Sequence, residues 1–301
     1  MTIPRDGTDR WREFGAYADA LAAGGRIPPH LGTPARLRVQ QSNQIPRQEK
    51  FGRDLVTYLD GKRIALRIYE PEAFTGTVMF VHGGGWVIGS LDAYDAWCEA
   101  LSQCVPARVV SVGYRLAPEH PFPAALDDVR QAYAWVTENF PDEQIAVVGD
   151  SAGGNLITAM SRSVDQKDRA CAQVLVYPVL DTSRPFDPDD SAGLLLSGRD
   201  MNWFIDQYLP DEQSRRTTAA SPLLDDSCVG APPTLLVLAG LDPVRAQGLK
   251  FAEQLRIAGI EVEVADFPSM GHGFLTLRGT FEDAEAALDA ISDFIRKHLA
   301  H

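Results

Sequence analysis

Basic residues are scarce in this chain: 28 lysine and arginine residues stand against 41 aspartate and glutamate residues, which gives a net charge of −13 at pH 7. A surface with this excess of negative charge repels phosphate groups, and no Lys/Arg-rich stretch offers a local exception. The composition therefore excludes a nucleic-acid-binding protein and a protein attached to anionic membranes. A neutral small-molecule substrate fits this charge better than a strongly anionic one.

Cysteine is also scarce, with four residues in 301: Cys98, Cys104, Cys171 and Cys228. They are too few and too scattered for a disulfide framework, and no CxxC pair or HExxH run indicates a metal site. The first residues lack the apolar core of a signal peptide, and no apolar run is long enough to cross a membrane. These absences predict a cytoplasmic protein with reduced thiols and no bound metal.

Two kinds of segment alternate from Phe51 onward. Apolar runs rich in β-branched residues predict strands at 54–59, 64–69, 77–81, 108–112, 145–149, 172–177, 234–240 and 261–265. Amphipathic stretches predict helices, most clearly at 122–140, 244–259 and 281–299. This alternation is typical of an α/β fold, a mostly parallel sheet with both faces covered. Asp60-Gly61, between the first two strands, predicts an antiparallel hairpin at one edge.

Two segments depart from this alternation. Near the N-terminus, apolar residues recur at helical spacing: Trp11, Phe14, Tyr17, Ala18 and Leu21. The stretch that follows, to residue 50, is rich in proline, glycine and polar residues, so it cannot build a core and must lie on the rest of the protein. The second segment, from Pro178 to Pro233, is too long for a simple connection and predicts a functional insertion with a helix at 199–209.

The motif GDSAGG at Gly149–Gly154 follows one predicted strand directly and opens a predicted helix. This setting favours Ser151 as a catalytic nucleophile, because a sharp turn between strand and helix lifts the hydroxyl clear of the sheet. Gly149 and Gly153 leave room where a Cβ atom would meet neighbouring backbone. The alternative is that Ser151 only caps the helix.

A second glycine-rich loop, HGGGW at His82–Trp86, follows the strand predicted at 77–81. Consecutive glycines let backbone N–H groups turn toward one point, as acyl transfer requires for the negative charge of its tetrahedral intermediate. We expect Gly84 and Gly85 to donate from this loop, together with the N–H of Ala152. A dinucleotide site is the alternative, but the glycine spacing is one residue too long and the next strand ends without an acidic residue.

His272 is the best-placed histidine, between glycines on a loop that precedes the last predicted helix. The chain order of nucleophile, acid and histidine is that of a hydrolase triad, and this order favours Asp242, just after the strand at 234–240. Its carboxylate would hold the imidazole in the right tautomer, and it is also suited to begin the next helix. Asp266 is the rival acid, but it precedes the histidine by only six residues.

Five motifs together resemble the bacterial hormone-sensitive-lipase-like family of α/β-hydrolases, also called the GDXG group: HGGGWVIGSLDAYD, YRLAPEHPFPAALDD, GDSAGGNL, LDP and GHGF. They stand in the family's order over about residues 50–301. The resemblance implies an α/β-hydrolase fold, with an eight-stranded mostly parallel sheet flanked by helices. It also implies a helical cap, formed by residues 1–50 and a second part at about 183–215, over a catalytic domain at 51–301.

The family's members are mostly esterases that act on short- to medium-chain acyl esters without cofactors, and homodimers are common among them. The triad carried over is Ser151, Asp242 and His272, with Gly84, Gly85 and Ala152 as oxyanion donors. One departure is visible, since the family often has a second acidic residue after the catalytic acid, where this chain has Ala246.

The acyl pocket is the least defined part of this interpretation. Four aromatic residues are candidates for its lining, although aromatic residues at helical spacing are more often core residues: Trp86, Trp203, Phe204 and Tyr208. The alternatives to a serine carboxylesterase are an amidase or other acyl hydrolase with the same triad, a lipase active on emulsified lipid, and a non-catalytic small-molecule binder on the same fold.

Overall fold

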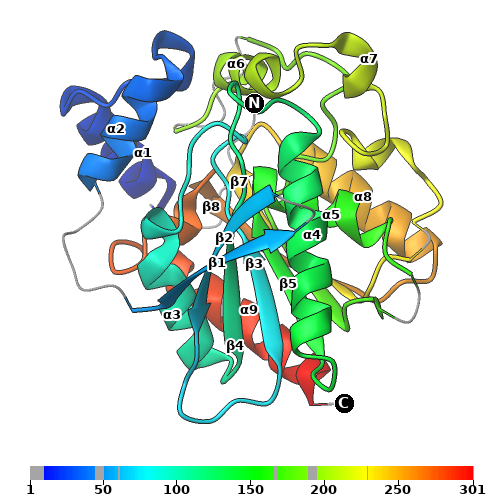
Figure 1. Ribbon diagram of the computed structural model, residues 1–301. Helices are drawn as coiled ribbons and strands as arrows, with labels where there is room; N and C mark the ends of the chain where they lie inside the picture. Colours follow the sequence, from blue (N-terminus) through cyan, green and yellow to red (C-terminus); the bar gives the residue numbers. More distant parts are fainter. Residues whose placement is uncertain are drawn as a thin grey trace.

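The computed structural model describes residues 10–44, 51–59, 62–165, 168–188, 195–228 and 230–300. An eight-stranded sheet runs through the molecule in the order β1-β2-β4-β3-β5-β6-β7-β8 (Figure 1). The strands are β1 (Arg53–Leu59), β2 (Lys62–Tyr69), β3 (Thr77–Val81), β4 (Arg108–Gly113), β5 (Ile145–Asp150), β6 (Ala172–Val176), β7 (Thr234–Leu241) and β8 (Val262–Gly271).

The pairing of the strands confirms the predicted sheet. β2 pairs antiparallel with both β1 and β4, and every other pair of neighbours is parallel. The antiparallel strands therefore lie at one edge, as the sequence indicates, while the predicted turn at Asp60-Gly61 falls outside the described residues. All strands from β3 to β8 end at the same edge of the sheet, which is where ligands bind in open α/β sheets.

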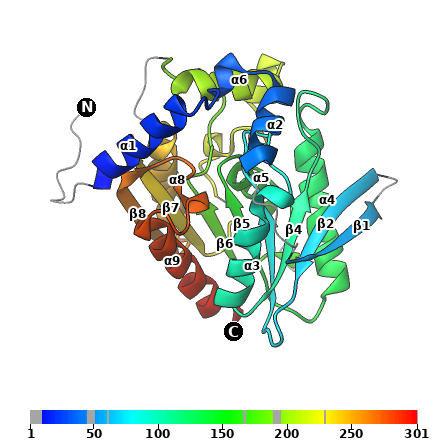
Figure 2. The same ribbon diagram turned by 90° about the vertical axis from the view of Figure 1, so that its left-hand side faces the viewer.

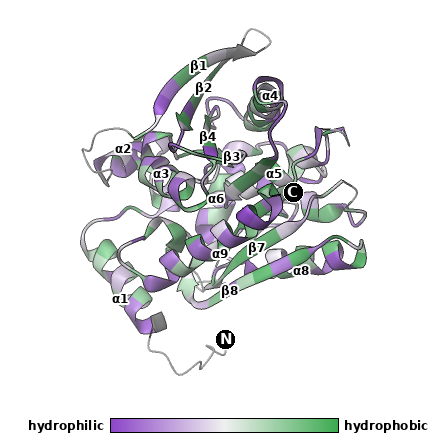
Figure 3. Ribbon diagram, turned by 90° about the horizontal axis from the view of Figure 1, so that it is seen from below, coloured by the Kyte–Doolittle hydropathy of each residue, from purple (hydrophilic) through white to green (hydrophobic). Residues whose placement is uncertain are grey.

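Helices cover both faces of the sheet. They are α3 (Asp95–Cys104), α4 (Ala124–Asn139), α5 (Ala152–Ser161), α8 (Arg245–Ile257) and α9 (Glu282–Leu299), with short 3-10 helices at η2 (Asp92–Tyr94), η4 (Pro222–Leu224) and η5 (Phe274–Thr276). Two buried clusters result, because successive side chains of a strand point to opposite faces. Met79 and Val81 of β3 pack with α4, α5 and α8, whereas Val78 and Phe80 pack with α3 and α9. Strands β3, β5 and β6 are accordingly buried along their whole length. Helix α9 alternates hydrophobic and hydrophilic residues (Figure 3).

The two segments that depart from the alternation meet in space. The N-terminal one forms α1 (Arg10–Ala23), η1 (Pro29–Leu31) and α2 (Pro34–Gln44), and the insertion forms α6 (Gly198–Tyr208) and α7 (Glu212–Arg215). Figures 1 and 2 show α1, α2 and α6 side by side at one end of the sheet. His30 of η1 bonds to Asp200 of α6, with 2.7 Å between its Nδ1 and the carboxylate. The helices expected around residue 14 and at 199–209 are thus both present.

Helix α2 was not expected, since its segment was interpreted only as a polar stretch rich in proline and glycine. Thr33 precedes the helix, its Oγ1 accepts the Arg36 N–H, and Pro34 takes the first helical position, where proline is favourable. Only Leu37 of α2 is a buried hydrophobic residue. The helix therefore lacks the apolar periodicity by which a helix is predicted, and polar contacts hold it to the rest of the molecule.

Candidate active site

Ser151 lies at a sharp turn between β5 and α5. Its backbone has φ 54° and ψ −117°, a conformation that costs free energy for a residue with a Cβ atom. Glycine is required on both sides of this turn. A Cβ atom at Gly153 would lie 2.0 Å from the Val81 carbonyl oxygen, and one at Gly149 would lie 2.6 Å from the backbone of Gly153. The predicted strand, turn and helix around the serine are therefore present.

His272 links the serine to an acid. Its Nε2 lies 2.8 Å from the Ser151 Oγ, and its Nδ1 lies 2.7 Å from Oδ2 of Asp242. A carboxylate only accepts, so Nδ1 carries the proton and Nε2 is free to accept the serine hydroxyl proton. The three groups form one continuous hydrogen-bonded chain, the geometry by which a nucleophile and its base are recognised.

The structure separates the two candidate acids. Asp242 is the residue after β7, and its side chain is fully buried. Its second oxygen accepts the Val244 N–H at the start of the next turn. Asp266 instead lies in β8, where it pairs with Arg245 at 2.6 Å near the surface. Only Asp242 is therefore within hydrogen-bond distance of the imidazole.

The glycine-rich loop after β3 lies against the serine turn. The Gly83 N–H donates to Oδ1 of Asp150 at 2.7 Å, and Asp150 immediately precedes the serine. Within the part of the chain that the structure describes, no acceptor is bonded to the N–H groups of Gly84, Gly85 or Ala152. Unpaired N–H groups of this kind are what an oxyanion site needs.

Asp150 is a residue of the site to which the sequence reasoning assigned no role. It is buried, and besides the Gly83 N–H it accepts the Tyr94 hydroxyl at 2.8 Å. Burial raises the pKa of its carboxyl to about 6, although both hydrogen bonds act in the opposite direction. A charged residue at the end of the apolar strand IAVVGD was the available signal for this contact.

Two ring systems support the loop and the base. Burial lowers the pKa of His82 to about 4, so its ring is neutral at pH 7, and Nδ1 donates to the Gly83 carbonyl at 2.7 Å. Tyr177 has φ 35° and follows β6, and its ring centroid lies 4.6 Å from that of His272. Nothing in the sequence of the Tyr177 segment distinguishes it from an ordinary buried strand end.

The four aromatic residues expected at the acyl pocket lie near the loop, with different exposures. Trp86 and Tyr208 are fully buried and stack on each other at 4.6 Å, so neither offers surface to a ligand in this conformation. Phe204 packs directly on the loop, because a Cβ atom at Gly85 would lie 2.3 Å from its ring. Trp203 is half-buried and contacts Phe204 edge to face at 5.2 Å.

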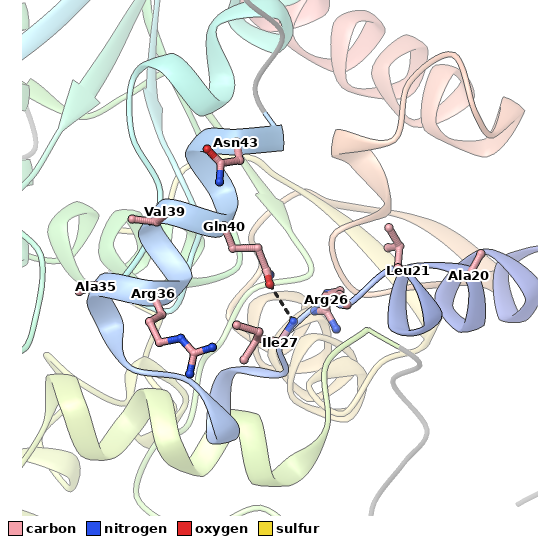
Figure 4. A pocket seen from close by; sticks show the side chains of 11 residues that line it. Ala20, Leu21, Arg26, Ile27, Ala35, Arg36, Val39, Gln40 and Asn43 are labelled. Carbon is pink, nitrogen blue, oxygen red and sulfur yellow. Dashed lines mark hydrogen bonds between the residues drawn. The ribbon is translucent and has the colours of Figure 1, made fainter.

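The N-terminal segment contacts the chain next to His272 and encloses a separate cavity. A Cβ atom at Gly271, the residue before His272, would lie 2.4 Å from the Phe14 ring of α1. A cavity of about 590 Å³ lies between α1 and α2, and Figure 4 shows the Gln40 side chain crossing it to the Ile27 N–H, at 2.7 Å. No expected site residue is among the described residues that line it.

Among the described residues, no group of His, Cys, Asp and Glu side chains could hold a metal ion. The described helices include none that is both long and apolar enough to span a membrane. All four cysteines are free thiols, of which Cys98 and Cys228 are buried.

The chain is similar to known ester hydrolases along most of its length. A family model described as the α/β-hydrolase fold matches residues 78–276. An ethyl acetate hydrolase of Pseudomonas putida is 33% identical, covering 95% of this chain and 98% of that protein. The carboxylic ester hydrolase LipN of Mycobacterium tuberculosis is 37% identical, covering 79% of this chain and 68% of its own length.

A solved structure extends the likeness to almost the whole chain. An ester hydrolase from the metagenome of Lake Arreo, in complex with a bipyridine phosphonate derivative, superposes with a TM-score of 0.87 at 29% identity. The match covers 98% of this chain and 99% of that one. The chain therefore belongs to the hormone-sensitive-lipase-like family of α/β-hydrolases.

Proposed function

We propose that this carboxylesterase hydrolyses short- to medium-chain acyl esters through an acyl-enzyme intermediate on Ser151. The observation that carries the proposal is the continuous chain of hydrogen bonds from the Ser151 hydroxyl through His272 to Asp242. The similarity to an ethyl acetate hydrolase supports a short acyl substrate. Esters are better substrates than amides for such a site, because an alkoxide leaves more readily than an amine.

In the first half of the reaction, the Ser151 oxygen attacks the ester carbonyl while His272 Nε2 takes the hydroxyl proton. The imidazolium that forms is stabilised by Asp242, whose buried carboxylate already holds the Nδ1 proton. His272 then gives its proton to the departing alkoxide. Water deacylates the enzyme by the same steps, with the imidazole again acting as the base.

The negative charge of each tetrahedral intermediate rests on the N–H groups of Gly84, Gly85 and Ala152. The absence of any bonded acceptor for these groups among the described residues supports this role. Ala152 also begins α5, so the positive end of the helix dipole favours charge at this point.

A cap formed by residues 1–50 and about 183–215 covers the site in this proposal, over a catalytic domain at 51–301. The contact of Phe14 with Gly271 and that of Phe204 with Gly85 support it, since each joins a cap helix to a residue beside the triad or the oxyanion loop. Phe204 and Trp203 would then contact the acyl group, and the stacked pair Trp86 and Tyr208 would support them from behind.

We also infer a cytoplasmic location, because the four free thiols fit a reducing compartment. Homodimer formation stays a prediction, which sedimentation velocity of the purified protein would test.

The direct test is hydrolysis of p-nitrophenyl esters from acetate to palmitate by the wild type and by Ser151→Ala. We expect turnover of the shorter esters and a loss of kcat of about 10⁵-fold or more in the variant. A folded wild type that hydrolyses none of these esters, or an active variant, would contradict the proposal. A matched anilide that is hydrolysed faster than its ester would favour an amidase instead.

A further inference from the structure

Helix α2 of the N-terminal segment is hydrogen-bonded to the chain that directly follows the oxyanion glycines. Arg38 Nε donates to the Val87 carbonyl at 2.8 Å, and its Nη2 donates to the Ala117 carbonyl at 2.7 Å. The same guanidinium forms a bidentate pair with Glu119, with both distances at 2.8 Å. This pair lowers the pKa of the Glu119 carboxyl to about 2.

A second side chain on the same face of α2 holds the end of the loop. Oε1 of Gln41 accepts the Gly89 N–H at 2.8 Å. Gly89 has φ +99°, and a Cβ atom there would lie 2.4 Å from the His82 ring, so the loop has little room to shift at this point. Arg38 and Gln41 are three residues apart, which places both side chains on one face of the helix.

These bonds constrain the turn that carries the oxyanion donors. The N–H groups of Val87 and Ile88 both donate to the Gly84 carbonyl, at 3.1 and 2.9 Å. Ala117, the other carbonyl that Arg38 binds, donates its own N–H to Trp86 at 2.9 Å. The contacts of α2 therefore lie on the residues whose hydrogen bonds fix the peptide plane between Gly84 and Gly85, which carries the Gly85 N–H.

We propose that Arg38 and Gln41 are positioning residues that hold the glycine-rich loop in the geometry that stabilises the oxyanion, so that the N-terminal segment is needed for the chemical step as well as for covering the site. The inference rests on the proposed function of Gly84 and Gly85. It differs from a simple lid, in which α2 would admit and retain substrate without affecting the transition state.

The two roles predict different kinetics. A misplaced oxyanion donor stabilises the transition state less but scarcely affects substrate binding in the ground state. As a result, kcat falls while KM is nearly constant. The fall should be the same for every acyl chain, because all esters share the carbonyl oxygen. A lid role would instead raise KM, and the rise would grow with chain length.

The experiment measures kcat and KM of Arg38→Ala, Arg38→Lys and Gln41→Ala with p-nitrophenyl acetate and hexanoate. Ser42→Ala is the matched control, since Ser42 lies on the same helix, is exposed, and donates its hydroxyl to the Val39 carbonyl within that helix. We expect kcat to fall about tenfold or more in both alanine variants, with KM within about threefold of the wild type. Arg38→Lys should lose nearly as much kcat as Arg38→Ala, because one ammonium group cannot bond Val87, Ala117 and Glu119 together.

Circular dichroism and the unfolding midpoint identify any variant that fails to fold. If Arg38→Ala unfolds, Gln41→Ala tests the inference, because it removes only the amide that accepts the Gly89 N–H. Folded alanine variants with kcat within twofold of the wild type would overturn the inference, as would a rise in KM alone. Full recovery by Arg38→Lys would reduce the role of Arg38 to its charge. An inactive wild type or an active Ser151→Ala would overturn the proposed function instead, so the two failures are distinguishable.

Discussion

The site has two sides that are held in different ways. On the lower side, the Ser151 turn and the glycine-rich loop are held by buried contacts that only glycine permits. On the upper side, the N-terminal helices are held by hydrogen bonds of partly exposed side chains. Gly153 meets the Val81 carbonyl, and Asp150 binds the Gly83 N–H in the interior. Above, the Arg38 side chain is 31% exposed and its partner Glu119 is 55% exposed. The lower side consists of residues close in sequence to the motifs, and the upper side joins segments far apart along the chain.

This difference separates the residues that carry out the reaction from those that adjust its rate. Close backbone contacts in a packed interior allow almost no displacement without a large cost in free energy. Exposed ion pairs contribute about 0–1 kcal/mol each, so the upper side can loosen while the fold remains intact. We therefore expect substitutions below the serine to lower kcat by larger factors than substitutions above it.

The largest effect is expected when the two candidate acids are compared directly. Asp242→Asn should lower kcat by about 10³- to 10⁴-fold, because the amide favours the wrong imidazole tautomer. Asp266→Asn is the matched control and should leave kcat within about twofold, since Asp266 pairs with Arg245. Steady-state kinetics with p-nitrophenyl acetate measure kcat of both variants. Equal losses of kcat would contradict the assignment of Asp242 as the acid of the triad.

An intermediate effect is expected at Asp150, which joins the serine turn to the glycine-rich loop. Asp150→Asn should lower kcat about ten- to hundredfold, because one carboxylate oxygen that now accepts a hydrogen bond becomes a donor facing the Gly83 N–H or the Tyr94 hydroxyl. Unchanged kcat in a folded variant would show that the loop does not depend on this carboxylate.

The same variant should change the pH dependence of stability. Burial raises the pKa of Asp150 in the folded state from 3.8 to about 6, so the folded protein binds the proton more tightly than the unfolded chain does. The free energy of unfolding therefore falls as pH rises from about 4 to 6, by about 3 kcal/mol at most from this group. Urea unfolding at several pH values should show a flatter profile for Asp150→Asn, and parallel profiles would contradict this.

The smallest effect is expected where the N-terminal segment meets α6 of the insertion. His30→Gln removes the imidazole hydrogen bond to Asp200, and we expect kcat within about twofold and a loss of less than about 1 kcal/mol of unfolding free energy. Burial alone would raise the pKa of Asp200, but the hydrogen bonds from His30 and Ser197 lower it overall. This carboxylate therefore adds stability above the unfolded pKa, and that stability is lost as pH falls below about 3.8. A large fall in kcat would mean that the upper side is as rigidly held as the lower.

The strands and the lower side of the site were predictable from sequence for physical reasons. Parallel strands buried on both faces read as apolar runs, and β3 to β7 were located in this way. The antiparallel strands β1 and β2 were located by the hairpin signal between them. Ser151 stands in a glycine motif because neighbouring backbone leaves no room for a Cβ atom at Gly149 or Gly153. The close contact is therefore visible in the sequence as conspicuous glycines. His272 and Asp242 were found by chain order and by their positions after strands, and the structure brings both to the serine.

The contacts of the upper side were harder to predict from the sequence. Helix α2 is held by Arg38 and Gln41 rather than by an apolar face, and polar side chains in a polar segment give no periodic signal. Tyr177 contacts His272 only because two loops meet in space. The burial of Trp86 and Tyr208 was likewise not evident, since an aromatic residue near a glycine loop can face either substrate or core.

The central claim, that Ser151 is activated by His272 as the nucleophile, is tested most directly by intact-mass analysis after reaction with a p-nitrophenyl phosphonate. A phosphonyl group transferred to the nucleophile releases p-nitrophenolate and stays bound. The account predicts one added phosphonyl group per chain, with the modified peptide containing Ser151, and no adduct in Ser151→Ala. An enzyme that hydrolyses esters but carries its adduct on another residue, or carries none, would contradict the account.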